Sequence, residues 1–241
     1  MKPCRLPSES AILDFVGALR EYAFCDNSAV LPRLREFVLS FSDAGVADAF
    51  IASLPGIVDD LKTDVEAIMS IDPAAEGPDE VIACYPGVKV MINYRSAHSL
   101  LELGVETVPR MITELAHSLT GVDIHPAARI GRWFAIDHGT GVVIGETAVI
   151  GNHVTIYQGV TLGAKRFHYD ASGRPVNIPR HPILEDNVTV YSNTSILGRV
   201  TIGHDTVVGG NIWLTHNVPP HSRILQSNAV YVREFSEGAG I

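Results

Sequence analysis

Residues 184–218 read LEDNVTVYSNTSILGRVTIGHDTVVGGNIWLTHNV, and this stretch has a period of six. An aliphatic residue returns at every sixth position, at Leu184, Val190, Ile196, Ile202, Val208 and Leu214. The fourth residue after each of these is β-branched: Val188, Thr194, Val200, Thr206, Ile212 and Val218. An amphipathic helix and a single alternating strand have other periods, but the hexapeptide repeats of a parallel β-helix have this one. The pattern therefore predicts a solenoid whose stacked coils share one aliphatic core.

The same period extends toward the N-terminus. Aliphatic residues stand at Ile124, Ile130 and Ile136, and again at Ile144, Ile150, Ile156 and Leu162. The frame breaks between Gly163 and Arg180, so residues 164–179 are expected to form an inserted loop that projects from one corner of the solenoid. Other corners are expected to use the backbone freedom of glycine, at Gly131, Gly145, Gly151 and Gly203. An ordinary β-sandwich is the alternative, and the unbroken register on both sides of the loop argues against it.

The composition argues against several classes of function. The chain has 241 residues, of which 46% are hydrophobic and 19% charged, which is typical of a soluble globular protein. A formal net charge of −9 argues against nucleic-acid or anionic-membrane partners, because binding phosphates requires clustered Lys and Arg. Its three cysteines, Cys4, Cys25 and Cys84, form no Cys-x-x-Cys pair, and no apolar signal segment or membrane span is seen. We therefore expect a cytoplasmic protein.

The region before the repeats has the pattern of helices. Apolar residues recur at helical spacing over residues 12–19, 34–41 and 57–68. Ser8 is a suitable N-cap, and Pro32 suits a first helical turn. Helix ends are predicted at Asp72-Pro73, Gly104 and Gly121. The predicted fold class is therefore α+β, with an α-helical domain over residues 1–120, a β-helix over residues 121–222 and a C-terminal tail over residues 223–241.

Charged residues gather in three short segments where the repeat would favour small ones. These segments are residues 123–126 (DIHP), 136–141 (IDHGTG) and 180–182 (RHP). His138 follows the inward-facing Ile136 by two positions, so its ring is expected at the outer surface. The repeat also stutters there, since Ile136 and Ile144 are eight residues apart. Broken local rules often mark functional sites, so His138 is the leading candidate for a catalytic group.

Together these motifs resemble those of the bacterial serine O-acetyltransferases, a family of hexapeptide-repeat acyltransferases. The resemblance covers most of the chain and rests on residues 123–131 (DIHPAARIG), 136–151 (IDHGTGVVIGETAVIG) and 180–182, with Asp72-Pro73-Ala74 and Tyr85-Pro86-Gly87 in the helical region. It implies a left-handed parallel β-helix that assembles as a homotrimer or a dimer of trimers. It also implies transfer of acetyl from acetyl-CoA to the hydroxyl of L-serine, which gives O-acetyl-L-serine for cysteine biosynthesis.

The resemblance implies that His138 is the general base. A serine hydroxyl is a poor nucleophile, and an imidazole near neutral pKa can remove its proton during attack on the thioester. Asp123 would hold this imidazole in the correct tautomer. Direct transfer of this kind requires neither a metal nor a covalent acyl-enzyme.

The resemblance also assigns the recognition of serine. Asp72 and Asp137 would bind its ammonium group, Arg180 would bind its carboxylate, and His181 would contact the substrate or the developing oxyanion. Because the sites of this family lie between subunits of a trimer, these residues need not come from one chain.

Acetyl-CoA is expected to lie between adjacent solenoids, with its pantetheine arm near Gly163, Ala164 and Ser192. Lys165 and Arg166 are candidates for contact with its phosphates. The chain departs from many relatives after residue 222, where it reads ILQSNA in place of a Gly-x-Pro-Ala-Arg turn. Because of this departure, the sequence does not assign the residues that contact the nucleotide end of CoA. The loop over residues 164–179 is a candidate lid.

The chain ends in EGAGI, residues 237–241. Many serine acetyltransferases end in a Gly-rich segment that closes with Ile, whose carboxylate docks in the active site of cysteine synthase, O-acetylserine sulfhydrylase. The resemblance therefore implies this enzyme as a partner through Ile241. Inhibition by L-cysteine at the serine site is a further expectation from the family.

Two other classes of protein remain as alternatives. A metal enzyme of the γ-carbonic-anhydrase type would need three converging histidines, for which the candidates are His125, His138, His153, His181 and His204. These do not form the pattern of that family. A non-catalytic solenoid would favour flat, regular outward ladders over a charged stutter. Among acyltransferases, homoserine or an amino sugar could replace serine as the acceptor.

Overall fold

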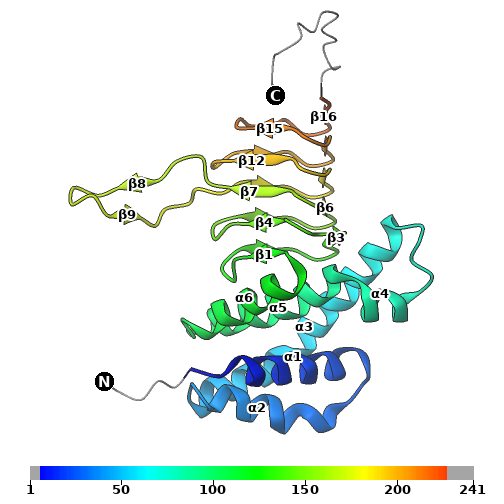
Figure 1. The fold of residues 1–241 in the computed structure, drawn as a ribbon, viewed down its shortest axis with the longest axis vertical. Helices are drawn as coiled ribbons and strands as arrows, with labels where there is room; N and C mark the ends of the chain where they lie inside the picture. Colours follow the sequence, from blue (N-terminus) through cyan, green and yellow to red (C-terminus); the bar gives the residue numbers. More distant parts are fainter. Residues whose placement is uncertain (1–5, 227–241) are drawn as a thin grey trace, which may run out of the picture.

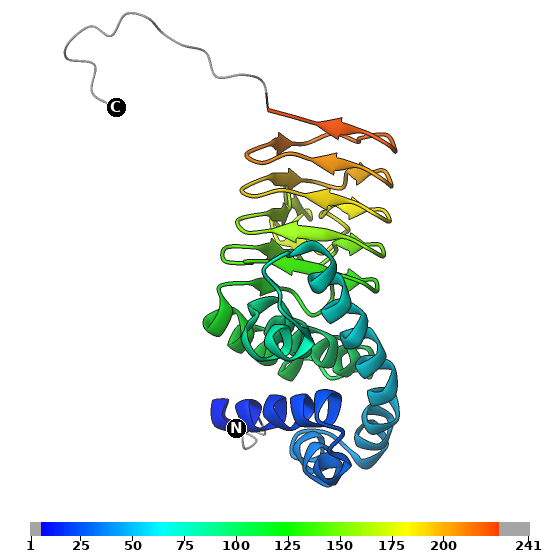
Figure 2. The same cartoon turned by 90° about the vertical axis from the view of Figure 1, so that its right-hand side faces the viewer.

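The computed structural model describes residues 6–226 and has two parts, a bundle of helices and a stack of β-coils above it (Figure 1). The helices precede the strands in the chain and cover one end of the stack, and a view turned by 90° shows the coils as parallel layers (Figure 2). The helical elements are α1 (Glu9–Phe24), η1 (Ser28–Val30), α2 (Leu31–Leu39), α3 (Ala44–Ile71), α4 (Pro78–Cys84), α5 (Pro86–Glu102) and α6 (Val108–Thr120). None of the helices in the described residues is long and apolar enough to span a membrane.

Helix ends follow the predicted signals, with two differences. Ser8 caps α1 by accepting a hydrogen bond from the Ala11 backbone N–H, and Gly121 ends α6 in the left-handed conformation. Helix α3 begins much earlier than its apolar pattern at residues 57–68 indicated, because the Asp43 side chain caps it and Pro55 is accommodated inside it. The short helix α4 was not predicted.

The strands form a left-handed parallel β-helix, as expected. Sheet A contains β1 (Asp123–Ile124), β4 (Val143–Ile144), β7 (Thr161–Gly163), β12 (Ser195–Leu197) and β15 (Trp213–Leu214). Sheet B contains β2 (Arg129–Ile130), β5 (Val149–Ile150), β10 (Ile183–Leu184) and β13 (Thr201–Ile202). Sheet C contains β3 (Ala135–Asp137), β6 (Thr155–Tyr157), β11 (Thr189–Val190), β14 (Val207–Val208) and β16 (Arg223–Ile224).

The register of these sheets confirms the hexad frame across the insertion. Leu184 pairs with Ile150 before the loop and with Ile202 after it, although 34 positions separate the first pair and 18 the second. The additional residues leave the stack as an antiparallel hairpin, β8 (His168–Tyr169) and β9 (Pro175–Val176), which projects to one side in Figure 1. The repeat aliphatics that the frame places inward share one core, in which most are buried and Ile130 and Ile212 are partly buried.

The corner glycines have a different role from the one expected. Gly131, Gly145, Gly151 and Gly203 do not have positive φ angles. A Cβ at Gly203, for example, would lie 2.4 Å from the Pro220 backbone nitrogen in the next coil. These glycines allow close approach between coils, whereas left-handed backbone at the corners is supplied mainly by polar residues such as His138, His153 and Asn193.

A buried ion pair joins the helical part to the β-helix. Arg95 of α5 donates to Asp64 of α3 through Nε and Nη2, at 2.7 and 2.8 Å, and to the Gly131 carbonyl oxygen at 2.8 Å. The Asp64 carboxylate also accepts the Phe134 backbone N–H at 3.1 Å. This pair therefore holds α3 against the first coil, which places the C-terminal end of α3 beside β3.

Candidate active site

The predicted site residues form two clusters at two corners of the β-helix. We call the turn from sheet C to sheet A the C-to-A corner, and the turn from sheet A to sheet B the A-to-B corner. The first cluster contains Asp72, Asp137 and His138 and lies at the C-to-A corner. The second contains Asp123, Arg180 and His181 and lies on the outer side of sheet A and at the A-to-B corner. In Figure 1, β3 and α4 lie on the side of the stack opposite to the hairpin.

His138 lies at the surface, as its position in the repeat predicted. It follows β3 directly and has a φ of 55°, in the left-handed region, and its side chain is 71% exposed. Its Nδ1 lies 3.9 Å from Asp137 Oδ1. The ring is therefore accessible to a substrate and close to a carboxylate of the same turn.

Asp72 comes directly after α3 and is held by two hydrogen bonds. The Tyr85 hydroxyl donates to Asp72 Oδ2 at 2.6 Å, and the Ala74 backbone N–H donates to Oδ1 at 2.8 Å. These bonds, with a smaller contribution from His138, hold the pKa of Asp72 below its usual value. The same hydrogen bond raises the pKa of Tyr85 to about 12. The Asp72 side chain is therefore an ionised carboxylate at neutral pH.

Two tyrosines lie above the first cluster along sheet C. Tyr157 pairs with Asp137 across neighbouring strands, and its ring stacks on Tyr191 with centroids 4.8 Å apart. Burial raises the pKa of Tyr157, and Tyr191, Asp137 and Asp72 add to this effect. The Tyr157 phenol therefore stays neutral, and the two stacked rings form an aromatic wall beside the carboxylates.

The second cluster is centred on Arg180 and His181, where the chain returns from the hairpin. Arg180 Nη2 donates to Glu146 Oε2 at 2.6 Å, and its Nη1 donates to Asn177 Oδ1 at 2.7 Å. Burial opposes ionisation of Glu146, but hydrogen bonds from Asn177 and Arg180 outweigh it and lower the pKa of this carboxyl. The guanidinium is thus oriented by partners at its own corner.

His181 is buried and packs over Gly145. A Cβ at Gly145 would lie 2.1 Å from the ring, so any other residue there would displace His181. Burial first, and then the charge of Arg180, lower the pKa of His181 to about 4. The same two causes, with Arg110 in addition, lower the pKa of the nearby His125. Both imidazoles are therefore neutral at physiological pH.

Asp123 does not meet His138 within this chain. Its salt-bridge partner among residues 6–226 is Arg110 of α6, whose Nη2 lies 3.8 Å from Asp123 Oδ1 and also contacts Glu114. Asp123 and His125 flank the inward-facing Ile124 and so share the outer face of sheet A. The predicted acid–imidazole pair is therefore divided between the two clusters.

The three residues expected at acetyl-CoA are divided in the same way. Ser192 follows Tyr191 at the C-to-A corner, and its carbonyl oxygen accepts the Asn211 backbone N–H. Gly163 ends β7, and Ala164 follows it at the base of the hairpin. There they lead into a groove of about 350 Å³ that is rich in basic side chains, from Lys165, Arg166, His168, Arg180 and Arg199.

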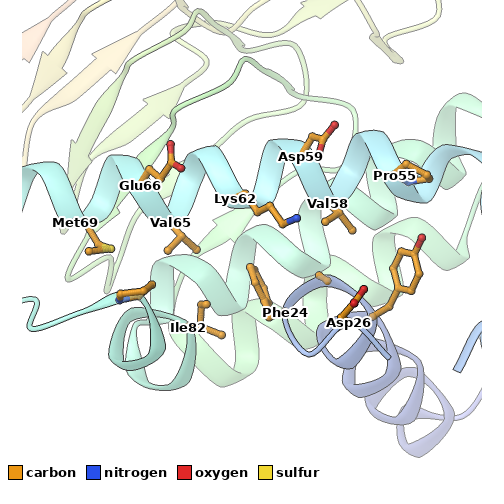
Figure 3. A pocket seen from close by; sticks show the side chains of 13 residues that line it. Phe24, Asp26, Pro55, Val58, Asp59, Lys62, Val65, Glu66, Met69 and Ile82 are labelled. Atoms are coloured by element: carbon orange, nitrogen blue, oxygen red, sulfur yellow. The ribbon is translucent and has the colours of Figure 1, made fainter. Parts of the chain in front are cut away.

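A larger cavity, of about 830 Å³, lies away from both clusters (Figure 3). It is bounded by α1, α3 and α4 and combines apolar side chains such as Val58 and Ile82 with Asp59, Lys62 and Glu66. None of the predicted site residues lines it.

The histidines considered as metal ligands do not converge within residues 6–226. Two groups have ligand atoms close enough to hold an ion: His204, Asp205 and His221, and Glu114, His117 and Asp123. Of the five candidate histidines, only His204 belongs to either group. In the second group, Arg110 already contacts both carboxylates.

Sequence reasoning missed several residues of this site. Glu146 and Thr147 stood inside the quoted motif at residues 136–151, yet no role was assigned to them. Tyr85 was noted only as part of a motif, and Tyr157 and Tyr191 were not considered. Their position in the repeat could have identified the two tyrosines. Asp137, Tyr157 and Tyr191 each follow an inward-facing residue at the equivalent place in successive coils.

Comparison with known proteins identifies the family. A scan against protein-family models finds no match. A Helicobacter pylori serine acetyltransferase is 40% identical over 170 residues, which cover 70% of this chain and 95% of the relative. The chain belongs to the serine acetyltransferase family.

Two further relatives agree with this membership. A plasmid-encoded serine acetyltransferase of Synechococcus elongatus is 46% identical over 211 residues, or 87% of this chain, although the chain spans just under two thirds of that relative, 66%. The crystal structure of Entamoeba histolytica serine acetyltransferase 1 in complex with L-cysteine has a TM-score of 0.79 at 35% identity. The superposed part covers 88% of this chain and 86% of the Entamoeba chain. The family and the fold therefore agree with the resemblance found in the sequence.

Proposed function

We propose that this protein is a serine O-acetyltransferase, which transfers acetyl from acetyl-CoA to the hydroxyl of L-serine and so supplies O-acetyl-L-serine for cysteine biosynthesis. The observation that carries the proposal is the division of the polar residues into two complementary clusters. One cluster has an accessible imidazole and two carboxylates, and the other has a guanidinium and a neutral histidine. Together they match an amino acid that carries a hydroxyl group.

In this mechanism His138 removes the proton of the serine hydroxyl as its oxygen attacks the thioester carbonyl. The tetrahedral intermediate then collapses and expels the CoA thiolate. The imidazolium returns its proton to this sulfur, so the products are O-acetyl-L-serine and CoA with a free thiol. His138 ends in its starting state, and no covalent enzyme intermediate is needed.

Serine is held by its two charged groups. The ammonium binds between Asp72 and Asp137, and the low pKa of Asp72 supports a carboxylate there at neutral pH. The serine carboxylate binds Arg180, whose side chain Glu146 and Asn177 orient. This arrangement fixes the hydroxyl close to His138.

We infer that the site is completed between copies of the chain in a homotrimer. Asp123 lies with the second cluster, so its pairing with His138 requires the C-to-A corner of one copy to face sheet A of the next. The helical part is then available to join two trimers. Three-fold rings of this kind are closed assemblies. Each copy contributes one surface to the interface with one neighbour and a different surface to the interface with the other.

We infer that acetyl-CoA lies in the same junction. Its pantetheine would pass Gly163 and Ala164 of one copy and Ser192 of the next, and its phosphates would bind the basic groove with Lys165 and Arg166. The groove supports this because an anionic ligand offsets the mutual repulsion of its basic side chains. The chemistry requires acetyl-CoA as co-substrate and no metal.

The cellular setting belongs to the same proposal. Within residues 6–226, Cys25 and Cys84 form no disulfide, which suits the cytoplasm. Cysteine synthase is the proposed partner through Ile241, which lies outside the described residues. L-cysteine is the proposed inhibitor at the serine site.

A free-thiol release assay tests the activity. Acetyl-CoA is supplied with a panel that includes serine, homoserine and glucosamine, and wild type is compared with His138→Asn. Asparagine tolerates the left-handed backbone at this position. His153→Asn is the matched control, because His153 is also an exposed corner histidine, with a φ of 56°.

We expect thiol release with serine to fall by about 10²–10⁴-fold in His138→Asn and to stay near wild type in His153→Asn. Equal activity of both variants would reject His138 as the base. Preference for another acceptor, or no turnover by wild type, would reject the proposed reaction.

A further inference from the structure

Thr147 lies at the A-to-B corner, at the centre of the hydrogen bonds that hold Arg180 and His181. The backbone N–H groups of Arg180 and His181 both donate to Thr147 Oγ1, at 2.8 and 3.1 Å. A hydroxyl group has two acceptor lone pairs and one donor hydrogen. Both lone pairs are thus occupied, so the hydroxyl hydrogen points to His181 Nδ1, which lies 2.9 Å from Oγ1.

A second donor reaches the same ring nitrogen. The Thr147 backbone N–H donates to His181 Nδ1 at 3.0 Å. A ring nitrogen that accepts hydrogen bonds does not carry a proton, so the proton of the neutral ring is on Nε2. One residue therefore sets the tautomer of His181 through both its backbone and its side chain.

The surroundings also favour the neutral ring. The charged and titratable groups that face it are Arg180, Glu146, His125 and Arg199, and of these only Glu146 favours protonation. Arg199 Nη1 donates to the carbonyl oxygens of Thr147 and His181, at 2.7 and 3.1 Å, and so clamps both backbones. His181 is thus held in place as a neutral donor.

We propose that Thr147 is a positioning residue that makes His181 a neutral hydrogen-bond donor through Nε2, directed at the thioester carbonyl oxygen as that oxygen gains negative charge. This inference rests on the proposed acetyl transfer. Arg180 already provides the cation for the serine carboxylate, so a neutral N–H is better suited to an oxygen that is charged only in the transition state. Such a fixed donor lowers the barrier and contributes little to the binding of the ground state.

The tautomer is tested by NMR of the full-length protein with ¹⁵N-labelled histidine, with the His181 signals assigned from a His181→Asn sample. We expect a protonated shift at Nε2 and an unprotonated shift at Nδ1, with no titration between pH 5.5 and pH 8. A proton on Nδ1, or a ring that titrates in this range, would overturn the inference. This measurement does not depend on turnover, so it decides the tautomer even if the proposed reaction fails.

Kinetics of Thr147→Val test the role of the hydroxyl. We expect kcat to fall roughly 10-fold to 100-fold, because three polar groups lose a partner, while the KM for serine changes less than 3-fold. Thr147→Ser should restore most of kcat, because it keeps the hydroxyl. Thr189→Val is the control, since Thr189 lies in sheet C and its hydroxyl forms no hydrogen bond within residues 6–226.

Three outcomes would contradict the proposal. One is wild-type kcat in Thr147→Val, and another is a loss in Thr147→Ser as large as that in Thr147→Val. The third is a rise in the KM for serine with kcat unchanged, which would assign Thr147 to substrate binding. If Thr147→Val does not fold, the serine variant and the NMR of wild type still decide the question.

Discussion

The Tyr85 hydroxyl donates a 2.6 Å hydrogen bond to Asp72, and this bond ties the residue that precedes α5 to the residue that follows α3. Gly87 is in close contact with the same region, since a Cβ there would lie 2.6 Å from the Ile136 carbonyl oxygen of β3. The ends of two helices and one strand thus meet at the first cluster. Asp72 is positioned by the fold and by a single phenol.

Tyr85→Phe should weaken binding of serine. Without the phenol, the pKa of Asp72 rises toward its ordinary value, so its carboxylate protonates at higher pH. We expect the KM for serine to rise roughly 2-fold to 5-fold. In wild type, the lowered pKa keeps Asp72 charged as the pH falls. Without the phenol this protection is lost, so the acid limb of the kcat/KM profile should move to higher pH. Tyr22→Phe in α1 is the control, and identical pH profiles for both variants would contradict this role.

Asp64→Asn should destabilise the protein. The change leaves the buried Arg95 guanidinium with only the longer contact to the partly exposed Asp60, at 3.3 Å, and loss of one partner of a buried pair typically costs up to about 3–5 kcal/mol. The midpoint of urea unfolding measures this. Asp48→Asn breaks the exposed pair with Arg35 and should leave the midpoint nearly unchanged. Equal midpoints for the two variants would show that the buried pair does not hold α3 to the first coil.

Replacing residues 165–178 by a short Gly-Ser link should leave the β-helix intact, because Leu162 and Ile196 pair directly across the insertion. We expect affinity for CoA to fall at least roughly 10-fold, since basic residues of the groove are lost. Calorimetric titration with CoA measures the change. Lys165→Gln with Arg166→Gln keeps the hairpin and separates the effect of charge from that of a lid. Unchanged affinity and kinetics in the shortened chain would exclude both roles.

Removal of Ile241 should abolish binding to cysteine synthase and leave acetyl transfer unchanged. If the proposed partner binds the terminal carboxylate together with an aliphatic side chain, Ile241→Val should bind and a chain with an added C-terminal Gly should not. Surface plasmon resonance with O-acetylserine sulfhydrylase gives the affinities. Tight binding by the truncated chain would rule out this contact.

Much of the fold was accessible from the sequence because it depends on local periodicity. The hexads placed the inward aliphatics in the core, with Ile130 only partly buried, and the position of His138 two residues after Ile136 predicted its exposure. Caps such as Ser8 and Gly121 were read correctly, because each satisfies backbone groups within a few residues of itself.

The remaining features depend on contacts between distant parts of the chain. The Arg95–Asp64 pair and the 34-residue reach from Thr147 to His181 have no signal in local spacing. Gly145 was explained by backbone freedom, yet its neighbour in space, the His181 ring, is what requires it. The apolar pattern at residues 57–68 covers only the later part of α3, which begins at Ala44 and contains Pro55, a residue that usually breaks a helix.

The division of the site between two corners has a genetic consequence. If His138 of one copy works with Arg180 of the next, a chain that lacks the histidine and a chain that lacks the arginine are each inactive alone. Mixed rings of the two, however, contain junctions in which both partners are native. Two defective alleles expressed in one cell would therefore complement each other, whereas two alleles with defects in the same cluster would not.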